Sequence, residues 1–97
     1  MNDELVHREQ PSPNHDERAL PITMAVIHYT EMESTEAALA RLTDPAAKVS
    51  AHYLISAAGE VTRLVAEERR AWHAGLSFWR GIRDINSASI GIELDHP

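Results

Sequence analysis

One short apolar run, Met24–Tyr29, places the strongest constraint on how this chain can fold. The run is rich in β-forming side chains, is too short for a typical helix, and is preceded by Pro21. Apolar residues at consecutive positions are typical of a central strand that is covered on both faces. We therefore expect a sheet with residues 24–29 at its centre and packed layers on both sides.

The next segment carries the signals of a helix followed by a hairpin. Ser34 can cap a helix that runs to about Thr43, where Asp44-Pro45 stops it. Residues 51–56 and 61–65 are both strand-like and flank a turn that contains a glycine. This order predicts that a helix leads into an antiparallel pair of strands.

The last third of the chain is expected to be mostly irregular until a final strand. Residues 67–70 are charged and are interpreted as a solvated stretch of at most one helical turn. Residues 71–88 look like a loop, yet they hold three of the five aromatic side chains of the chain, which suggests the rim of a site. Residues 89–94 alternate as a strand, with Ile90, Ile92 and Leu94 on one face and Ser89, Gly91 and Glu93 on the other.

These elements together predict an α/β fold, with a small mixed β-sheet and flanking helices. Residues 1–20 are polar and show no periodic pattern, so we expect a polar N-terminal tail that settles onto the domain from about Ser12. Residues 21–97 then form the folded part of a single domain, since a chain of 97 residues can build only one core of limited size.

Composition excludes several classes of function. The chain has no cysteine, which rules out disulfides, thiolate metal sites and a cysteine nucleophile. Its net charge of −6 disfavours nucleic acid and anionic membranes as partners, and no apolar run approaches the length of a membrane span. The N-terminus is polar and acidic, without the basic and apolar regions of a leader, so we expect a cytoplasmic location.

Two side chains on predicted strands could carry chemistry. His28 lies near the C-terminal end of its strand, where α/β sheets bind ligands. The competing interpretation is a core histidine whose ring nitrogens are hydrogen-bonded. Glu93 is either a carboxylate facing solvent or, if it faces a cavity, a general acid or base with a raised pKa.

Two further histidines lie inside predicted elements. His52 alternates with Leu54 on the hairpin, where a structural role is the simpler interpretation. His73 follows Trp72 in the aromatic loop and precedes a glycine, which favours a substrate contact. The spacing of His28, His52 and His73 matches no local metal motif. The residues by themselves therefore predict only a cluster of His and Glu side chains on a small sheet.

Four segments in order carry a resemblance to a known family: residues 26–30, 49–55, 71–75, and Asn86 with 89–94. Over residues 12–97 the chain resembles the zinc-dependent N-acetylmuramoyl-L-alanine amidases of the type 2 amidase family, which are related in fold to the peptidoglycan recognition proteins. The resemblance implies that this fold is present as the N-terminal portion of an amidase domain.

The resemblance implies a hydrolase of peptidoglycan or muropeptides, one role of which is muropeptide recycling. Such enzymes cut the amide between N-acetylmuramic acid and L-alanine with the help of a zinc ion. By resemblance, His28 is a zinc ligand and Glu93 is the general base of the glutamate-using branch, because Ala51 stands where other branches carry tyrosine. His73, Lys48 and Asn86 match positions that contact substrate.

The resemblance also implies that the metal site is incomplete within these residues. The second and third zinc ligands of the family belong to a later Gly-His-x-Asp…Lys-x-Asp-Pro segment, which would lie beyond Pro97. We therefore expect the isolated 97-residue chain to be inactive. The alternatives are a non-catalytic muropeptide-binding module or an inactive fragment, completed by a second chain with the C-terminal portion or by self-association.

Overall fold

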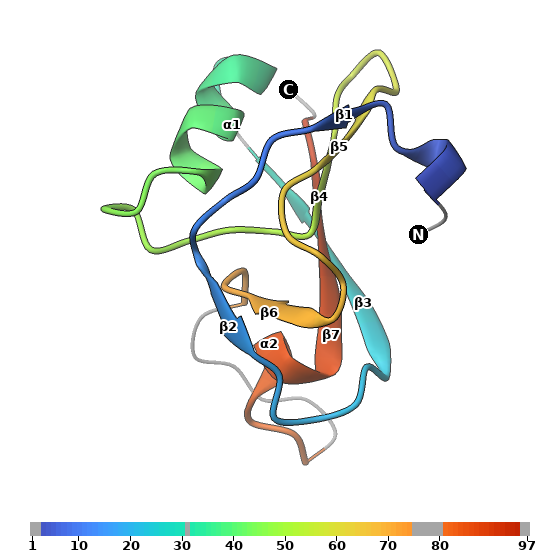
Figure 1. Ribbon diagram of the computed structural model, residues 1–97. Helices are drawn as coiled ribbons and strands as arrows, with labels where there is room; N and C mark the ends of the chain where they lie inside the picture. The colour runs from blue at the N-terminus through green and yellow to red at the C-terminus, as the bar shows by residue number, and fades with distance from the viewer. Residues whose placement is uncertain (1–2, 31, 75–80, 96–97) are drawn as a thin grey trace.

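The computed structural model describes residues 3–30, 32–74 and 81–95. In chain order the elements are η1 (Asp3–Leu5), β1 (Arg8–Glu9), β2 (His15–Glu17), β3 (Met24–Tyr29), α1 (Thr35–Leu42), β4 (Tyr53–Ile55), β5 (Val61–Arg63), β6 (Arg69–Ala71), α2 (Ile85–Ala88) and β7 (Ser89–Leu94). The strands form a main sheet in the order β1-β5-β4-β7-β3 and a small sheet of β2 and β6 (Figure 1).

The main sheet is mixed, as the sequence predicts. β7 runs parallel to both of its neighbours, β3 and β4, whereas β4 and β5 are the antiparallel hairpin. The register of β3 and β7 places His28 opposite Glu93. The two strands that carry the candidate site therefore lie side by side.

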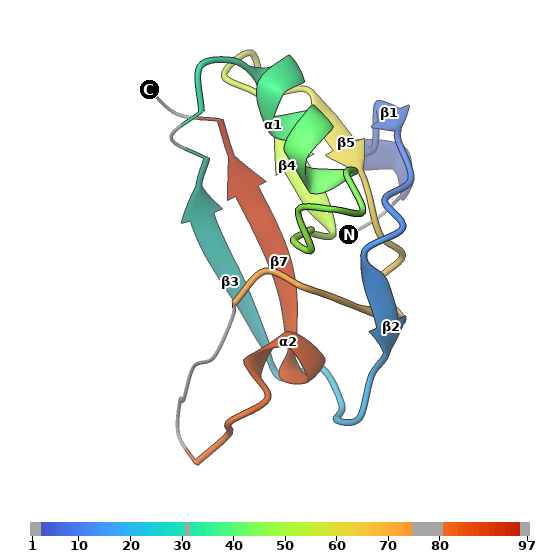
Figure 2. The ribbon, with the colours of Figure 1, turned by 90° about the vertical axis from the view of Figure 1, so that its left-hand side faces the viewer.

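α1 and the small sheet lie on one side of the main sheet (Figure 2). Ser34 caps the helix as predicted, because its Oγ accepts the N–H of Ala37 at 3.1 Å. A core forms under the helix from small and branched apolar side chains: Ala38, Leu39, Leu42, Ala51, Leu54, Leu64, Val65 and Ala71. This layer covers one face of the sheet. No helix in residues 3–30, 32–74 and 81–95 is long and apolar enough to cross a bilayer.

The expectation that Met24–Tyr29 forms a central strand covered on both faces is wrong. The run forms β3 as predicted, but β3 lies at the edge of the described sheet rather than at its centre. Ile27 and Tyr29 are 59% and 60% exposed, so only one face of the strand is covered. A continuous apolar run does not show by itself whether both of its faces are buried.

The N-terminal segment is more ordered than a tail. β1 already pairs with β5 at Arg8, earlier than the expected settling point near Ser12. Ser12 and Asn14 are buried, and Asn14 Nδ2 donates to the carbonyls of Asp44 at 2.9 Å and Val49 at 2.8 Å. Polar side chains that bury themselves by hydrogen bonding leave no apolar periodicity in the sequence.

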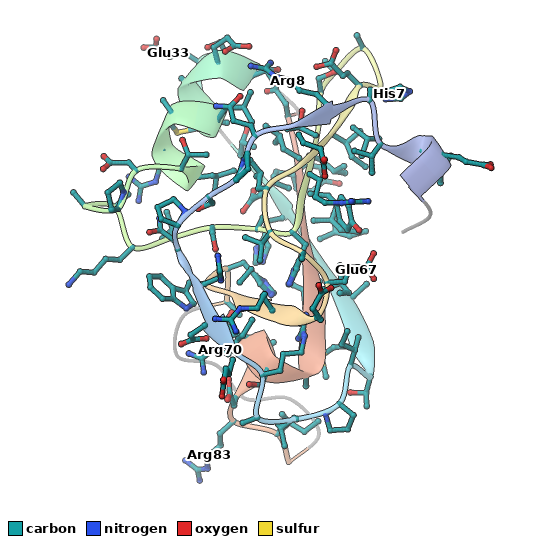
Figure 3. All side chains as sticks on the ribbon, viewed as in Figure 1. His7, Arg8, Glu33, Glu67, Arg70 and Arg83 are labelled. Carbon is teal, nitrogen blue, oxygen red and sulfur yellow. The ribbon has the colours of Figure 1, made fainter. Side chains whose placement is uncertain are left out.

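The interpretation of residues 67–70 as a solvated stretch of at most one helical turn is also wrong. The second half of that stretch belongs to β6, which pairs with β2, and the expected loop 71–88 begins with the end of β6 and ends with α2. Arg70, labelled in Figure 3, lies 3.2 Å from the carboxylate of Asp84, the N-cap of α2. Both strands of the small sheet are polar, so neither was recognisable without the other.

Candidate active site

His28 and Glu93 face the same cavity. They are register partners on adjacent parallel strands, so their side chains project from the same side of the sheet. Both line an open cavity of about 210 Å³, together with α1 residues and the aromatic Trp72. Of the two interpretations of Glu93, the structure favours the carboxylate that faces a cavity.

The environment of Glu93 makes its carboxylate a better proton acceptor. Burial raises the pKa of Glu93 above its ordinary value, and the nearby His28 opposes that shift. A carboxylate with a raised pKa holds a proton more tightly when it accepts one. This is the property that a general base for a water molecule requires.

His73 lies directly against His28. Its Nδ1 is 3.1 Å from His28 Nε2, and its Nε2 is 3.0 Å from the hydroxyl of Ser89. Burial, followed by the charges of His28 and His52, lowers the pKa of His73 to about 3. The ring is therefore neutral at ordinary pH and acts through hydrogen bonds rather than through charge.

Gly91 provides the space that the His73 ring occupies. A Cβ at position 91 would lie 2.4 Å from both Cγ and Cδ2 of that ring. This is well inside van der Waals contact, so any side chain at position 91 would displace His73. The glycine in the middle of β7 is thus part of the site, although the sequence singled it out only as a position on one strand face.

His52 has the structural role that the sequence favoured. The side chain is completely buried, Nδ1 accepts the N–H of Gly91 at 2.9 Å, and Nε2 lies 2.8 Å from the carbonyl of Arg69. Because Nδ1 is an acceptor, Nε2 carries the proton and donates to that carbonyl. Burial lowers the pKa of His52, so the ring is held neutral between β4, β6 and β7.

The remaining candidates lie at different distances from the cavity. The Oδ1 of Asn86 accepts the backbone N–H groups of His73 at 3.0 Å and Ala74 at 2.8 Å, so it holds the start of the aromatic loop. Lys48 is exposed, has a φ of 53°, and is not among the residues that line the cavity. Trp79 lies outside the described residues.

Ser89 and Arg41 are among the residues at the site that the sequence did not point to. Ser89 was predicted only as part of a strand face, and Arg41 of α1, which lines the cavity, was not singled out. Arg41 follows the buried Ala38 by three positions, and a cation at that spacing on the apolar side of a helix was an available signal. Ser89 gives no such signal, because its role depends on tertiary contacts.

A complete metal site is not formed by residues 3–30, 32–74 and 81–95. No group of three or more His, Cys, Asp or Glu side chains in those ranges could hold a metal ion. Both ring nitrogens of His52 and of His73 have hydrogen-bonding partners. His28 has one such partner, His73, at Nε2. The donor chemistry of the described residues therefore fits one imidazole ligand, His28, and not a whole zinc site.

Comparisons with known proteins identify the family. The family model described as N-acetylmuramoyl-L-alanine amidase matches residues 18–97, and the chain belongs to this family. It is 44% identical over 82 residues to N-acetylmuramoyl-L-alanine amidase AmiD of Escherichia coli K12, covering 77% of this chain and 29% of AmiD. It is 36% identical over 108 residues to 1,6-anhydro-N-acetylmuramyl-L-alanine amidase AmpD of Enterobacter cloacae, covering 91% of this chain and 57% of AmpD.

Solved structures agree with the family and confirm the predicted fold class. A crystal structure of a selenomethionine AmpD derivative superposes with a TM-score of 0.81 at 34% identity, over 92% of this chain and 60% of that one. Escherichia coli AmiD, solved in complex with the substrate anhydro-N-acetylmuramic acid-L-Ala-D-γ-Glu-L-Lys, superposes with a TM-score of 0.69 at 39% identity, over 84% of this chain and 34% of AmiD. The chain thus spans between 29% and 60% of the length of these relatives.

Proposed function

We propose that this chain supplies the His28 and Glu93 half of an N-acetylmuramoyl-L-alanine amidase that hydrolyses the amide between N-acetylmuramic acid and L-alanine in muropeptides. The observation that carries the proposal is the pairing of His28 with Glu93 across parallel strands, at one cavity. Membership of the amidase family and the muropeptide bound by AmiD support the substrate class.

In this proposal each residue has a defined task. Glu93 accepts a proton from the attacking water, for which its raised pKa suits it. His28 would hold zinc, which supplies Lewis-acid polarisation of the substrate carbonyl when bound. We propose that the other zinc ligands come from polypeptide outside the described residues, either in the same protein or in a second chain.

The substrate contacts are proposals of the same kind. His73 lines the cavity and is the best placed of the three candidates. Asn86 would act on substrate through the loop that it holds, and Lys48 would reach the substrate from outside the cavity wall. We likewise propose a cytoplasmic location, with recycled muropeptides as substrate, because of the similarity to 1,6-anhydro-N-acetylmuramyl-L-alanine amidase AmpD.

A second candidate function is muropeptide binding without catalysis, or an inactive fragment that associates with itself or with another chain. The absence of a three-residue ligand group among residues 3–30, 32–74 and 81–95, together with the exposed side chains of Ile27 and Tyr29, favours it. A half-buried carboxylate facing the same cavity as His28 favours catalysis, because binding alone does not require a base.

Two measurements on the purified protein, prepared without chelator, separate these functions. Native mass spectrometry determines whether zinc and a second polypeptide are present. Incubation with anhydromuramyl-L-Ala-D-γ-Glu-L-Lys then tests for release of the tripeptide. Zinc together with release supports the amidase, and binding of the muropeptide without release supports the binding module. Absence of zinc, binding and release together would overturn the amidase and the binding module and leave the inactive fragment.

A further inference from the structure

We propose that Ser89 and His73 fix the tautomer of His28, so that Nε2 of His28 carries the proton and Nδ1 keeps its lone pair. The role of that lone pair toward zinc rests on the proposed function, whereas the tautomer itself does not. Ser89 and His73 are then positioning residues for His28, and His73 has this role in addition to the substrate contact proposed above.

The Ser89 hydroxyl donates its proton in a fixed direction. Its Oγ lies 2.6 Å from the carbonyl oxygen of Ile85, and a carbonyl can only accept, so the hydroxyl proton is donated there. The same Oγ lies 3.0 Å from Nε2 of His73. Because the single hydroxyl proton is already used, Oγ accepts in this second contact and His73 Nε2 must carry a proton.

The protonation of the His73 nitrogens determines which nitrogen of His28 carries a proton. A neutral imidazole has one donor and one acceptor nitrogen, so a proton on Nε2 of His73 leaves its Nδ1 as an acceptor. His73 Nδ1 lies 3.1 Å from Nε2 of His28. His28 Nε2 must then donate, and in the neutral ring of His28 only Nδ1 retains a lone pair.

A His73 ring turned over by 180° would lose both contacts, because carbon atoms would then face His28 and the Ser89 hydroxyl. Gly91 lies tightly against the ring, because a Cβ at position 91 would lie 2.4 Å from Cγ and Cδ2 of His73. The rings of His28 and His52 meet it edge-on, with centroids 5.3 Å and 6.2 Å away. Neutral imidazoles that bind metal commonly donate their other N–H to a fixed acceptor, and His73 is that acceptor here.

The test is nitrogen-15 NMR of the histidine rings in the metal-free chain, at mildly alkaline pH. Long-range proton–nitrogen correlations show which ring nitrogen is protonated. We expect Nε2–H for both His28 and His73. A spectrum with Nδ1–H at His28 would overturn the proposal, and this result needs no variant.

Ser89→Ala removes the acceptor of His73 and should yield mixed tautomers at both His73 and His28. Ser87→Ala is the matched control, because Ser87 is equally buried and its Oγ accepts the N–H of Ala19 at 2.9 Å without touching either ring. Unchanged tautomers in Ser89→Ala, or an equal change in Ser87→Ala, would contradict the proposal.

Titration of the same sample with zinc chloride separates the tautomer from the proposed function. We expect zinc to perturb Nδ1 of His28 weakly, because His28 is the one ligand that the described residues supply, and Ser89→Ala to weaken that response about tenfold. The expected tautomer without any response of Nδ1 to zinc would support the positioning role and count against His28 as a metal ligand.

Discussion

Replacing Gly91 by alanine tests how tightly the site is packed. The new Cβ would lie 2.4 Å from the His73 ring, and ordinary contact begins near 3.4 Å, so the ring must move by about 1 Å. The two hydrogen bonds that hold the ring, at 3.1 Å to His28 and 3.0 Å to Ser89, would be stretched beyond the usable range.

The cost follows from these contacts. Each lost hydrogen bond is worth about 1 kcal/mol, and the overpacking itself costs about 1–3 kcal/mol. We therefore expect Gly91→Ala to lower the free energy of unfolding by about 3–5 kcal/mol. For a domain of this size that is a large part of a total of about 5–15 kcal/mol.

Urea unfolding, followed by circular dichroism, measures this change through the midpoint and the slope. Gly59→Ala is the control: it adds a methyl group at a φ of +89° with no atom within 4 Å, so it should cost only about 1 kcal/mol. In a His73→Ala background the ring is absent, and Gly91→Ala should then cost little. Equal costs of Gly91→Ala with and without the His73 ring would refute the reasoning.

Four other predictions concern Glu93, Tyr53 and Asn14. In the zinc-loaded complete enzyme, Glu93→Gln should lower kcat by about 10²–10⁴ and leave zinc bound. The control Glu68→Gln, at an exposed position, should change neither kcat nor zinc binding. A kcat of Glu93→Gln equal to that of the parent would exclude Glu93 as the base. Burial raises the pKa of Glu93 in the metal-free chain, and a general base must be ionised, so activity should fall toward acidic pH as Glu93 takes up a proton. A pH profile without this acidic limb would contradict the assignment. The phenol of Tyr53 donates to Glu67, and burial, followed by that hydrogen bond, raises the pKa of Tyr53 to about 12. The chain has two tyrosines, so in Tyr29→Phe the remaining phenol should titrate near pH 12 by ultraviolet absorbance. The raised pKa means that this stabilisation is lost as pH rises from about 10 to 12, and a midpoint near pH 10 would show that the Tyr53 environment is wrong. Asn14→Ala removes two hydrogen bonds from a buried amide and should lower the free energy of unfolding by about 2–3 kcal/mol in the same urea assay, an effect that would be absent if residues 1–20 were a free tail.

The elements that the sequence predicted correctly are the ones with local signals. The Ser34 cap, the hairpin, and the alternation along residues 89–94 depend on spacing within a few residues, and all three are present in the structure. The pairing of β2 with β6 depends on two polar segments more than 50 residues apart, so no local pattern could predict it.

At the candidate site, too, the features with local sequence signals could be predicted and those that depend on tertiary contacts could not. His28 and Glu93 could be chosen from their places on predicted strands, and family resemblance gave them roles. Their common cavity depends on parallel pairing of β3 with β7, which is a property of the topology. The contact of His73 with Ser89 requires a loop to cross a strand at a glycine, and spacing in the sequence carries no record of that crossing.

The open edge of β3 has a practical consequence for the production of this chain. β3 (Met24–Tyr29) has a neighbouring strand, β7, on one side only within the described sheet, and no lysine, proline or acidic side chain interrupts it. Strands of this composition seed cross-β aggregates when they are left uncovered. Yield after expression should therefore depend steeply on protein concentration, and inclusion bodies of this chain should bind amyloid dyes.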